Sequence, residues 1–385
     1  MIVDFFSPVN DSVVAHILSQ PSMVLGKIVR LHTEKEGFPD LNGIKIAIIG
    51  VAEGRGAELY NCYEGLYYIR KELYQLFAGN WHAEIADLGN IEQGNTIEDT
   101  YFAVATTVSS LLKENIIPII IGGSQDITYA NYRAYDALEQ TVNLVSVDSR
   151  FDIGTSEEEM LTRSFLSKVI MEEPNNLFNY SNIGYQTYFN SQEEILLLDK
   201  LYFDAYRLGE VKDITLVEPI LRDADIVSFD IGCVRQSEAP ANSNASPNGF
   251  YGEEACAIAR YAGISDKVTS FGVYEYNGVL DINNQTAKLI AQIIWYFVEG
   301  VNHRAYDYPY ATKESYEKYT VVLDDDDPLN FYKSDKSGRW WMEINLISNN
   351  KHKRHALIPC SYRDYEEALK LKIPKRWFKA LQKLA

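Results

Sequence analysis

The chain has 385 residues, 46% hydrophobic content and a formal net charge of −18. This length and apolar content suffice for one large core, or for one domain with an extension. The acidic charge argues against nonspecific binding to nucleic acid or anionic membranes. No apolar run approaches the roughly 20 residues that span a bilayer, and residues 1–10 lack a signal-peptide pattern. We therefore expect a cytoplasmic protein with no nucleic-acid partner and no membrane insertion.

The first 40 residues end in a turn at residues 37–40, and we interpret them as an N-terminal extension. Short apolar runs rich in β-branched residues then predict strands buried on both faces, as in a parallel sheet. These strands are expected at residues 44–50, 85–89, 116–121, 143–148, 225–230 and 268–275. Helices are expected between them at residues 56–77, 96–115, 252–262 and 284–299. The alternation predicts an α/β fold: a doubly wound, mainly parallel sheet in three αβα layers.

The predicted strands end in glycines and acids. Gly122 and Gly123 follow one strand, and Asp148, Asp230 and Glu275 stand at the ends of three others. Ligands of doubly wound folds bind beyond the carboxyl ends of the strands. The sequence therefore places a candidate site on this rim.

Residues 304–385 differ in character and are expected to form a C-terminal extension. We predict a loop at the aspartates 324–327 and a strand at residues 340–346, before a basic last stretch. The aspartates could suggest calcium, but a solvated acidic loop is favoured because their spacing does not match an EF-hand. The 27 tyrosines and the Trp340-Trp341 pair would suit a protein partner bound through this extension, although tyrosine also packs ordinary cores.

Cysteine and histidine usage limits the metal chemistry. The four cysteines match no CxxC pattern and are expected to be reduced, packed thiols; they are Cys62, Cys233, Cys256 and Cys360. None of the six histidines lies between His82 and His303. A metal site built in that stretch must therefore do without its imidazoles.

Several rim segments together resemble the ureohydrolase (arginase/agmatinase/formimidoylglutamase) family. Gly122–Asp126 is similar to the family's Gly-Gly-Asp-His-Ser segment. Asp148–Asp152 is similar to Asp-Ala-His-x-Asp, and its phenylalanine favours the formimidoylglutamase-like branch. Ser228–Gly232 is similar to Ser-Phe-Asp-x-Asp, and Glu275 matches the glutamate that faces the substrate's guanidinium or amidine group.

The resemblance covers residues 41–303 and implies an arginase/deacetylase-like fold. The expected division is therefore an extension at 1–40, a ureohydrolase-like α/β domain at 41–303 and a further extension at 304–385. Because family members commonly assemble, the resemblance also implies a homo-oligomer.

The family's metal ligands are only partly present. In the family, two histidines and four aspartates hold two manganese ions, which lower the pKa of a bridging water. The matching positions here are Gln125, Asp148, Arg150, Asp152, Asp230 and Gly232. The resemblance implies that Gln125 and the three aspartates could still hold one divalent cation, Mn, Mg or Ca. The second ion is not expected, because glycine offers no side chain and arginine stays protonated.

Three carboxylates held close together need a neutralising charge. A guanidinium can supply it through forked hydrogen bonds, so we expect Arg150 to replace the second metal and to bind Asp148 and Asp230. The alternatives are structural: the aspartates and Gln125 as helix caps or turn formers, and Glu275 as a salt-bridging acid. Cys233, beside the missing ligand, is expected to be a buried, inert thiol.

These departures favour an inactive or weak pseudoenzyme with a binding or scaffolding role. The alternative is a metal-dependent hydrolase of a linear amidine or guanidine, formimidoylglutamate first, in which Glu275 grips the substrate. A third hypothesis is binding of, or lyase chemistry on, a cationic small molecule at the acidic rim alone.

Overall fold

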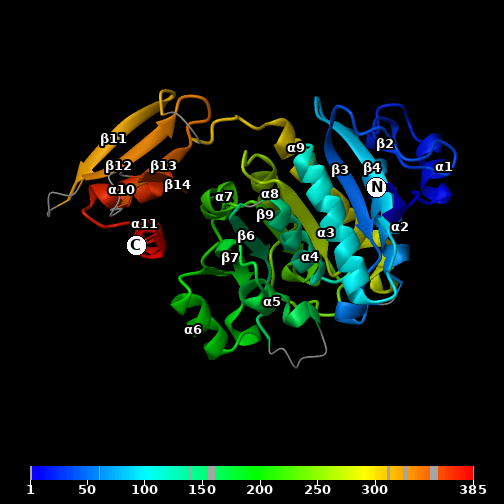
Figure 1. The fold of residues 1–385 in the computed structure, drawn as a ribbon, viewed down its shortest axis with the longest axis horizontal. Coiled ribbons are helices and arrows are strands. Elements are labelled where there is room, and N and C mark those ends of the chain that lie inside the picture. Colours follow the sequence, from blue (N-terminus) through cyan, green and yellow to red (C-terminus); the bar gives the residue numbers. More distant parts are fainter. Residues whose placement is uncertain are drawn as a thin grey trace.

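A large, mainly parallel sheet forms the centre of the chain (Figure 1). The computed structural model describes residues 2–59, 61–138, 140–154, 161–309, 313–323, 328–346 and 354–384. The strand order is β1-β4-β3-β5-β10-β9-β6-β7-β8, and β2 also pairs with β4. The strands are β1 (Phe6–Ser7), β2 (Arg30–Leu31), β3 (Ile44–Val51), β4 (Glu84–Ile91), β5 (Ile117–Ile121), β6 (Val142–Val147), β7 (Leu177–Tyr185), β8 (Asp204–Arg207), β9 (Ile226–Asp230) and β10 (Ser270–Tyr274). Pairing is parallel from β4 to β8, and β1 runs antiparallel to β4.

Helices cover both faces of this sheet. They are α1 (Asp11–Ser19), α2 (Cys62–Tyr74), α3 (Ile97–Lys113), α4 (Ile127–Arg133), α5 (Phe165–Met171), α6 (Gln192–Lys200), α7 (Glu218–Arg222), α8 (Gly252–Gly263) and α9 (Gln285–Asn302). Alternate side chains of β3 enter different cores: Ile48 packs with residues of α2, α8 and α9, whereas Ile49 packs with residues of α3 and α4. This alternation confirms the predicted three-layer α/β class. In the described part of the chain, no helix is long and apolar enough to cross a membrane.

The predicted strands and helices are present, with shifted ends. The helix predicted at residues 56–77 begins only at Cys62. The reason is local: Glu58 and Asn61 have positive φ angles of 52° and 61°, which a right-handed helix does not accommodate. Strands β7 and β8 were not predicted.

Helices α8 and α9 approach each other through glycines. A Cβ atom at Gly300 would lie 2.6 Å from the carbonyl oxygen of Arg260 and 2.9 Å from the Cα of Gly263. Gly300→Ala is therefore expected to destabilise the protein by about 1–3 kcal/mol, because the helices must separate. Urea unfolding measures the loss. Gly209→Ala is the matched control, since a Cβ there meets nothing within 4 Å; equal losses in the two variants would contradict this packing role.

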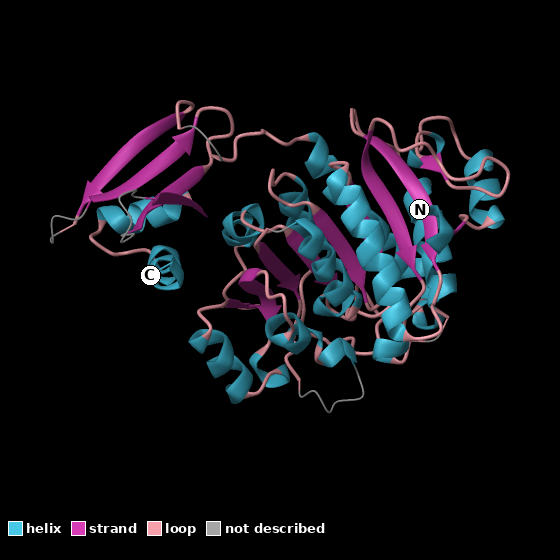
Figure 2. Cartoon of the chain, in the orientation of Figure 1, coloured by secondary structure: helices cyan, strands magenta, loops and turns pink. Residues whose placement is uncertain are grey.

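The C-terminal segment adds a second, antiparallel sheet (Figure 2). Its strands are β11 (Tyr316–Val322), β12 (Pro328–Ser334), β13 (Trp340–Leu346) and β14 (Arg354–Cys360), followed by α10 (Tyr362–Leu369) and α11 (Lys375–Leu384). One face packs Phe331, Trp340 and Met342 against Tyr365 of α10 and Trp377 of α11. The predicted strand at residues 340–346 is β13. The predicted loop at residues 324–327 lies outside the described residues, and the division of the chain at residues 40 and 303 stays a prediction.

Arg222, at the end of α7, joins the two sheets. Its guanidinium is 2% exposed and lies 4.5 Å from the ring centroid of Trp341 on β13. It donates hydrogen bonds to the carbonyl oxygens of Trp340 (3.0 Å) and Cys360 (2.7 Å), and pairs with Glu218 at 3.2 Å. The C-terminal segment is therefore fixed to the main domain by a buried cation.

Candidate functional site

Four neighbouring strands bring the predicted site residues to one rim. β10 pairs in parallel with both β5 and β9, and β9 pairs in parallel with β6. Their carboxyl ends therefore lie side by side and carry Gln125, Asp148, Asp230 and Glu275. These side chains are all buried, and so is Asp152. The rim predicted from the sequence is thus assembled as an enclosed cluster of carboxyl groups.

Asp148, Asp152 and Asp230 form the acid cluster at the centre of this rim. Burial, then the charges of Asp152 and Asp230, raises the pKa of Asp148 well above its usual range. Burial raises the pKa of Asp152 too, and outweighs the cations Arg163 and Arg150 and the neighbouring Asp148 carboxyl, which act to lower it. Asp148 Oδ2 has no hydrogen-bond partner among the described residues. Burial also raises the pKa of Asp230, to about 7.

Arg163 supplies positive charge to the acid cluster. It ends a short 3₁₀ helix, Leu161–Arg163, and its Nη1 lies 3.5 Å from Asp152 Oδ1. Burial lowers the pKa of Arg163, but the charges of Asp152, Asp148 and Asp230 outweigh it and hold the pKa above its usual value. A guanidinium does neutralise the carboxylates, as expected, but it belongs to a residue that the sequence did not single out.

Arg150 does not make the predicted pair with Asp148 and Asp230. Its backbone N–H donates to Asp148 Oδ1 at 2.9 Å. Its guanidinium instead donates to the Phe189 carbonyl oxygen at 3.2 Å and stacks on that ring, with 4.4 Å from Cζ to the centroid. Burial, then the charge of Arg163, lowers the pKa of Arg150. Repulsion between the two guanidiniums and the aromatic contact favour this outward position.

Glu275 is held by the chain on three sides. Its Oε1 accepts hydrogen bonds from the Gln125 backbone N–H at 2.8 Å and from the Thr162 hydroxyl at 2.7 Å. Its backbone N–H donates to the Gly123 carbonyl at 2.7 Å, and its φ angle is +67°. Burial, then the charge of Asp230, raises the pKa of Glu275 to about 8. Both side-chain hydrogen bonds fall on Oε1 and fix the orientation of the carboxyl group.

Gln125 and Gly232 both lie in close contact with neighbouring side chains of the site. The Gln125 amide donates a hydrogen bond to the Ser228 hydroxyl at 3.3 Å. Gln125 comes directly before Asp126, the N-cap residue of α4. A Cβ atom on Gly232 would lie 3.0 Å from Asn242 Oδ1 and 3.1 Å from Asp230 Oδ1. Asn242 thus lies where a larger residue at position 232 would project, and it donates to the Glu275 carbonyl at 2.8 Å.

Other residues of the site were missed or only partly foreseen. Asp126 is buried, accepts a hydrogen bond from the Tyr101 hydroxyl, and has its pKa raised by burial. Thr162, Arg163 and Asn242 lie in segments without helical or strand periodicity. The sequence offered one indication of Arg163 as a counter-ion, namely that it is a basic residue soon after the Asp148–Asp152 motif. Cys233 is buried, and burial raises its pKa, which is the state of an unreactive thiol.

The carboxylate oxygens are of the kind that hard cations bind. In the described ranges, however, no three His, Cys, Asp or Glu side chains are arranged to hold a metal ion. Arg163 already pairs with Asp152, and Arg150 and Gly232 stand at two further ligand positions implied by the resemblance. Neither arginine nor glycine has a side chain that can act as a metal ligand.

Comparison with known proteins shows the protein family of this chain. The Arginase family model matches residues 44–299, and the chain belongs to that family. It is similar to the formimidoylglutamase of Streptococcus gordonii, with 26% identity over 302 residues that cover 70% of this chain and 88% of that protein. This similarity confirms the resemblance drawn from the rim segments.

Solved structures show the same fold. The Trypanosoma cruzi formiminoglutamase solved with Mn²⁺₂ has a TM-score of 0.64 at 19% identity, covering 74% of this chain and 100% of that chain. The formimidoylglutamase of Bacillus subtilis also has a TM-score of 0.64 at 19% identity, covering 74% of this chain and 93% of that chain. In each comparison, about a quarter of the present chain lies outside the shared fold.

Proposed function

We propose that the chain binds a linear amidine or guanidine at the acid cluster and slowly hydrolyses its carbon–nitrogen bond, with formimidoylglutamate as the first substrate to test. The observation that carries this proposal is the burial of Asp148, Asp152, Asp230 and Glu275 on one rim. Carboxylates accept forked hydrogen bonds from amidinium and guanidinium groups. The formimidoylglutamases to which the chain is similar support the choice of reaction.

Proton transfer in this site falls to the carboxyl groups. A group that titrates near the working pH is suited to take a proton from water, and the pKa of Asp230 is about 7. Turnover is expected to be far slower than with a pair of metal ions, whose bound water ionises near neutral pH. At most one divalent cation per chain is expected.

A second candidate function is ligand binding or scaffolding without turnover. It is favoured by the ion pair between Arg163 and Asp152, which puts a fixed cation beside the acids. A cation in that place would compete both with a metal ion and with a cationic substrate. The same four carboxyls would then serve recognition alone.

Asp230→Asn is expected to abolish hydrolysis, because the amide cannot take a proton from water. Release of glutamate and formamide from formimidoylglutamate, and of urea from arginine and agmatine, measures turnover with Mn²⁺ and with chelator. Asp199→Asn, at an exposed position on α6, is the matched control and should keep the wild-type rate.

Each outcome decides between the candidates. The hydrolase is supported if the wild-type chain and Asp199→Asn release product and Asp230→Asn does not. Saturable binding by calorimetry without release supports the second function. If the chain shows neither product release nor ligand binding, both candidate functions are overturned. Two manganese ions bound per chain would contradict the expected limit of one cation.

A further inference from the structure

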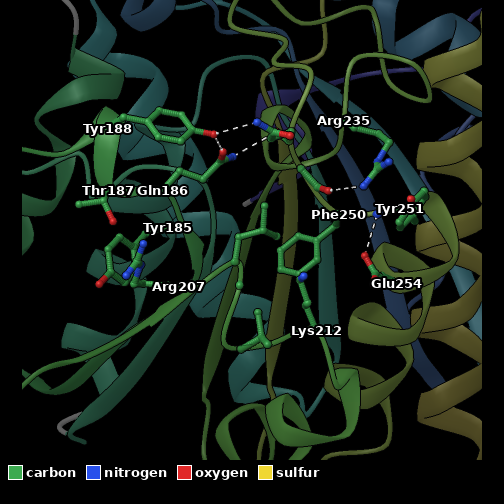
Figure 3. A pocket seen from close by; sticks show the side chains of 15 residues that line it. Tyr185, Gln186, Thr187, Tyr188, Arg207, Lys212, Arg235, Phe250, Tyr251 and Glu254 are labelled. Atoms are coloured by element: carbon green, nitrogen blue, oxygen red, sulfur yellow. Dashed lines mark hydrogen bonds between the residues drawn. The ribbon is translucent and has the colours of Figure 1, made fainter.

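A cavity of about 630 Å³ lies beyond the carboxyl ends of β7 and β8 (Figure 3). Its walls come from the end of β7 and the loop after it (residues 185–188), the end of β8 and the loop after it (residues 207–212), and the loop that leads into the first turn of α8 (residues 248–254). The acid cluster and Glu275 are not among its lining residues. This volume is in the range of pockets that enclose small organic ligands.

Basic side chains dominate the charge of this cavity. Arg207, Lys212 and Arg235 line it, against the single acid Glu254. Glu254 is already engaged, because its Oε2 accepts a hydrogen bond from the Tyr251 backbone N–H at 2.8 Å. The charged ends of Arg207 and Lys212 make no hydrogen bond or ion pair with any described residue. In a chain of net charge −18, this local excess of positive charge is available to an anion.

Aromatic rings stand beside these cations. The guanidinium carbon of Arg235 lies 3.3 Å from the ring centroid of Tyr251, and its Nη2 donates to the Gly249 carbonyl at 3.2 Å. Tyr188 and Tyr251 leave 64% and 47% of their surfaces exposed, whereas Phe250 is buried. Exposed rings at a cavity wall offer stacking surface to a planar ligand.

The wall that carries Tyr188 is held in place. The Tyr188 hydroxyl donates to the Gln186 side-chain oxygen, and the Gln186 amide donates to the Asn248 carbonyl at 3.1 Å (Figure 3). The Gln186 backbone N–H donates to the Ser149 carbonyl at 2.9 Å. The cavity is thus set before a ligand arrives, so little ordering is required on binding.

We propose that this cavity binds a small organic anion that carries a planar ring and a phosphate or carboxylate group. Arg207 and Lys212 bind the acid group, Arg235 contributes a third charge, and the ring stacks on Tyr188. Arginine and lysine both bind these anions through charge-assisted hydrogen bonds. This binding site is independent of any hydrolysis at the acid cluster.

Calorimetric titration of the full chain tests the proposal with 4-nitrophenyl phosphate, 4-nitrobenzoate and inorganic phosphate. We expect saturable binding of at least one aromatic probe, tighter than that of inorganic phosphate. Arg207→Gln and Lys212→Gln should each weaken it about tenfold, the effect of one charge-assisted contact. Lys113→Gln, at the exposed end of α3, removes the same charge elsewhere and should change nothing.

The two aromatic probes distinguish phosphate from carboxylate as the acid group. Tyr188→Ala should remove the advantage of the aromatic probe over inorganic phosphate. No saturable binding of any probe would overturn the proposal. Binding that survives in the Arg207→Gln/Lys212→Gln double variant, with Lys35→Gln/Lys113→Gln as its charge-matched control, would overturn it as well.

Discussion

Replacing Arg163 by methionine is expected to destabilise the fold by about 2–4 kcal/mol at pH 8, because it leaves buried carboxylates without their cation. The loss stays below that of a fully buried ion pair, because the Arg163 side chain is 21% exposed and partly solvated. Urea unfolding measures the loss, and Arg163→Lys should recover part of it. Arg150→Met is expected to cost less, because its guanidinium contacts Phe189 rather than the acids.

The loss on removing Arg163 should shrink at pH 5. Burial raises the pKa of Asp230 to about 7 and that of Glu275 to about 8. Groups with raised pKa values bind more protons in the folded than in the unfolded chain, so stability falls as pH rises from about 4 to 8. At pH 5 both carboxyls are largely neutral and need less compensation. Equal losses at the two pH values, or a larger loss in Arg150→Met, would contradict the role of Arg163.

Replacing Arg222 by methionine is expected to release the C-terminal sheet from the main domain at a cost of about 3–5 kcal/mol. The substitution leaves the carbonyls of Trp340 and Cys360 without their charged donor, and removes one of the two arginines that pair with Glu218. Limited proteolysis between the two sheets, together with urea unfolding, measures the effect.

Arg260→Met is the control for the Arg222 variant. Arg260 pairs with Glu299 at 2.8 Å, but its side chain is 39% exposed, so its loss should cost less than about 1 kcal/mol. The role given to Arg222 fails if both variants unfold at the same urea concentration and resist the protease equally.

Much of the central fold was predictable because its buried strands are short, β-branched apolar runs. Strands β7 and β8 escaped because polar residues interrupt them: Asn179, Ser181 and Asn182 lie within β7. Such runs satisfy neither strict alternation nor a continuous apolar pattern. Their existence depends on the pairing of β7 with β6 and of β8 with β7, which is a property of the folded chain rather than of either segment alone.

The acids of the site were predictable, and their counter-ion was not. Asp148 and Asp230 stand at strand ends, where local patterns locate them. The ion-pair partner of Asp152 is Arg163, which lies in a later segment. That segment must fold back onto the rim before the two side chains can pair. Arg150 is adjacent in sequence, yet only its backbone N–H binds Asp148, and its side chain lies against Phe189. Proximity along the chain therefore misidentified the cation.

The margins of the large sheet limit how copies of this chain can associate. On one side, the two-residue strands β1 and β2 both pair with β4. On the other, Lys379 of α11 donates to the Phe203 carbonyl at 3.3 Å and to the Asp204 carboxylate at 3.1 Å, at the start of β8. Covered margins of this kind oppose lateral strand addition, a common route to aggregation. An assembly of this protein would accordingly leave the central sheet of each copy intact.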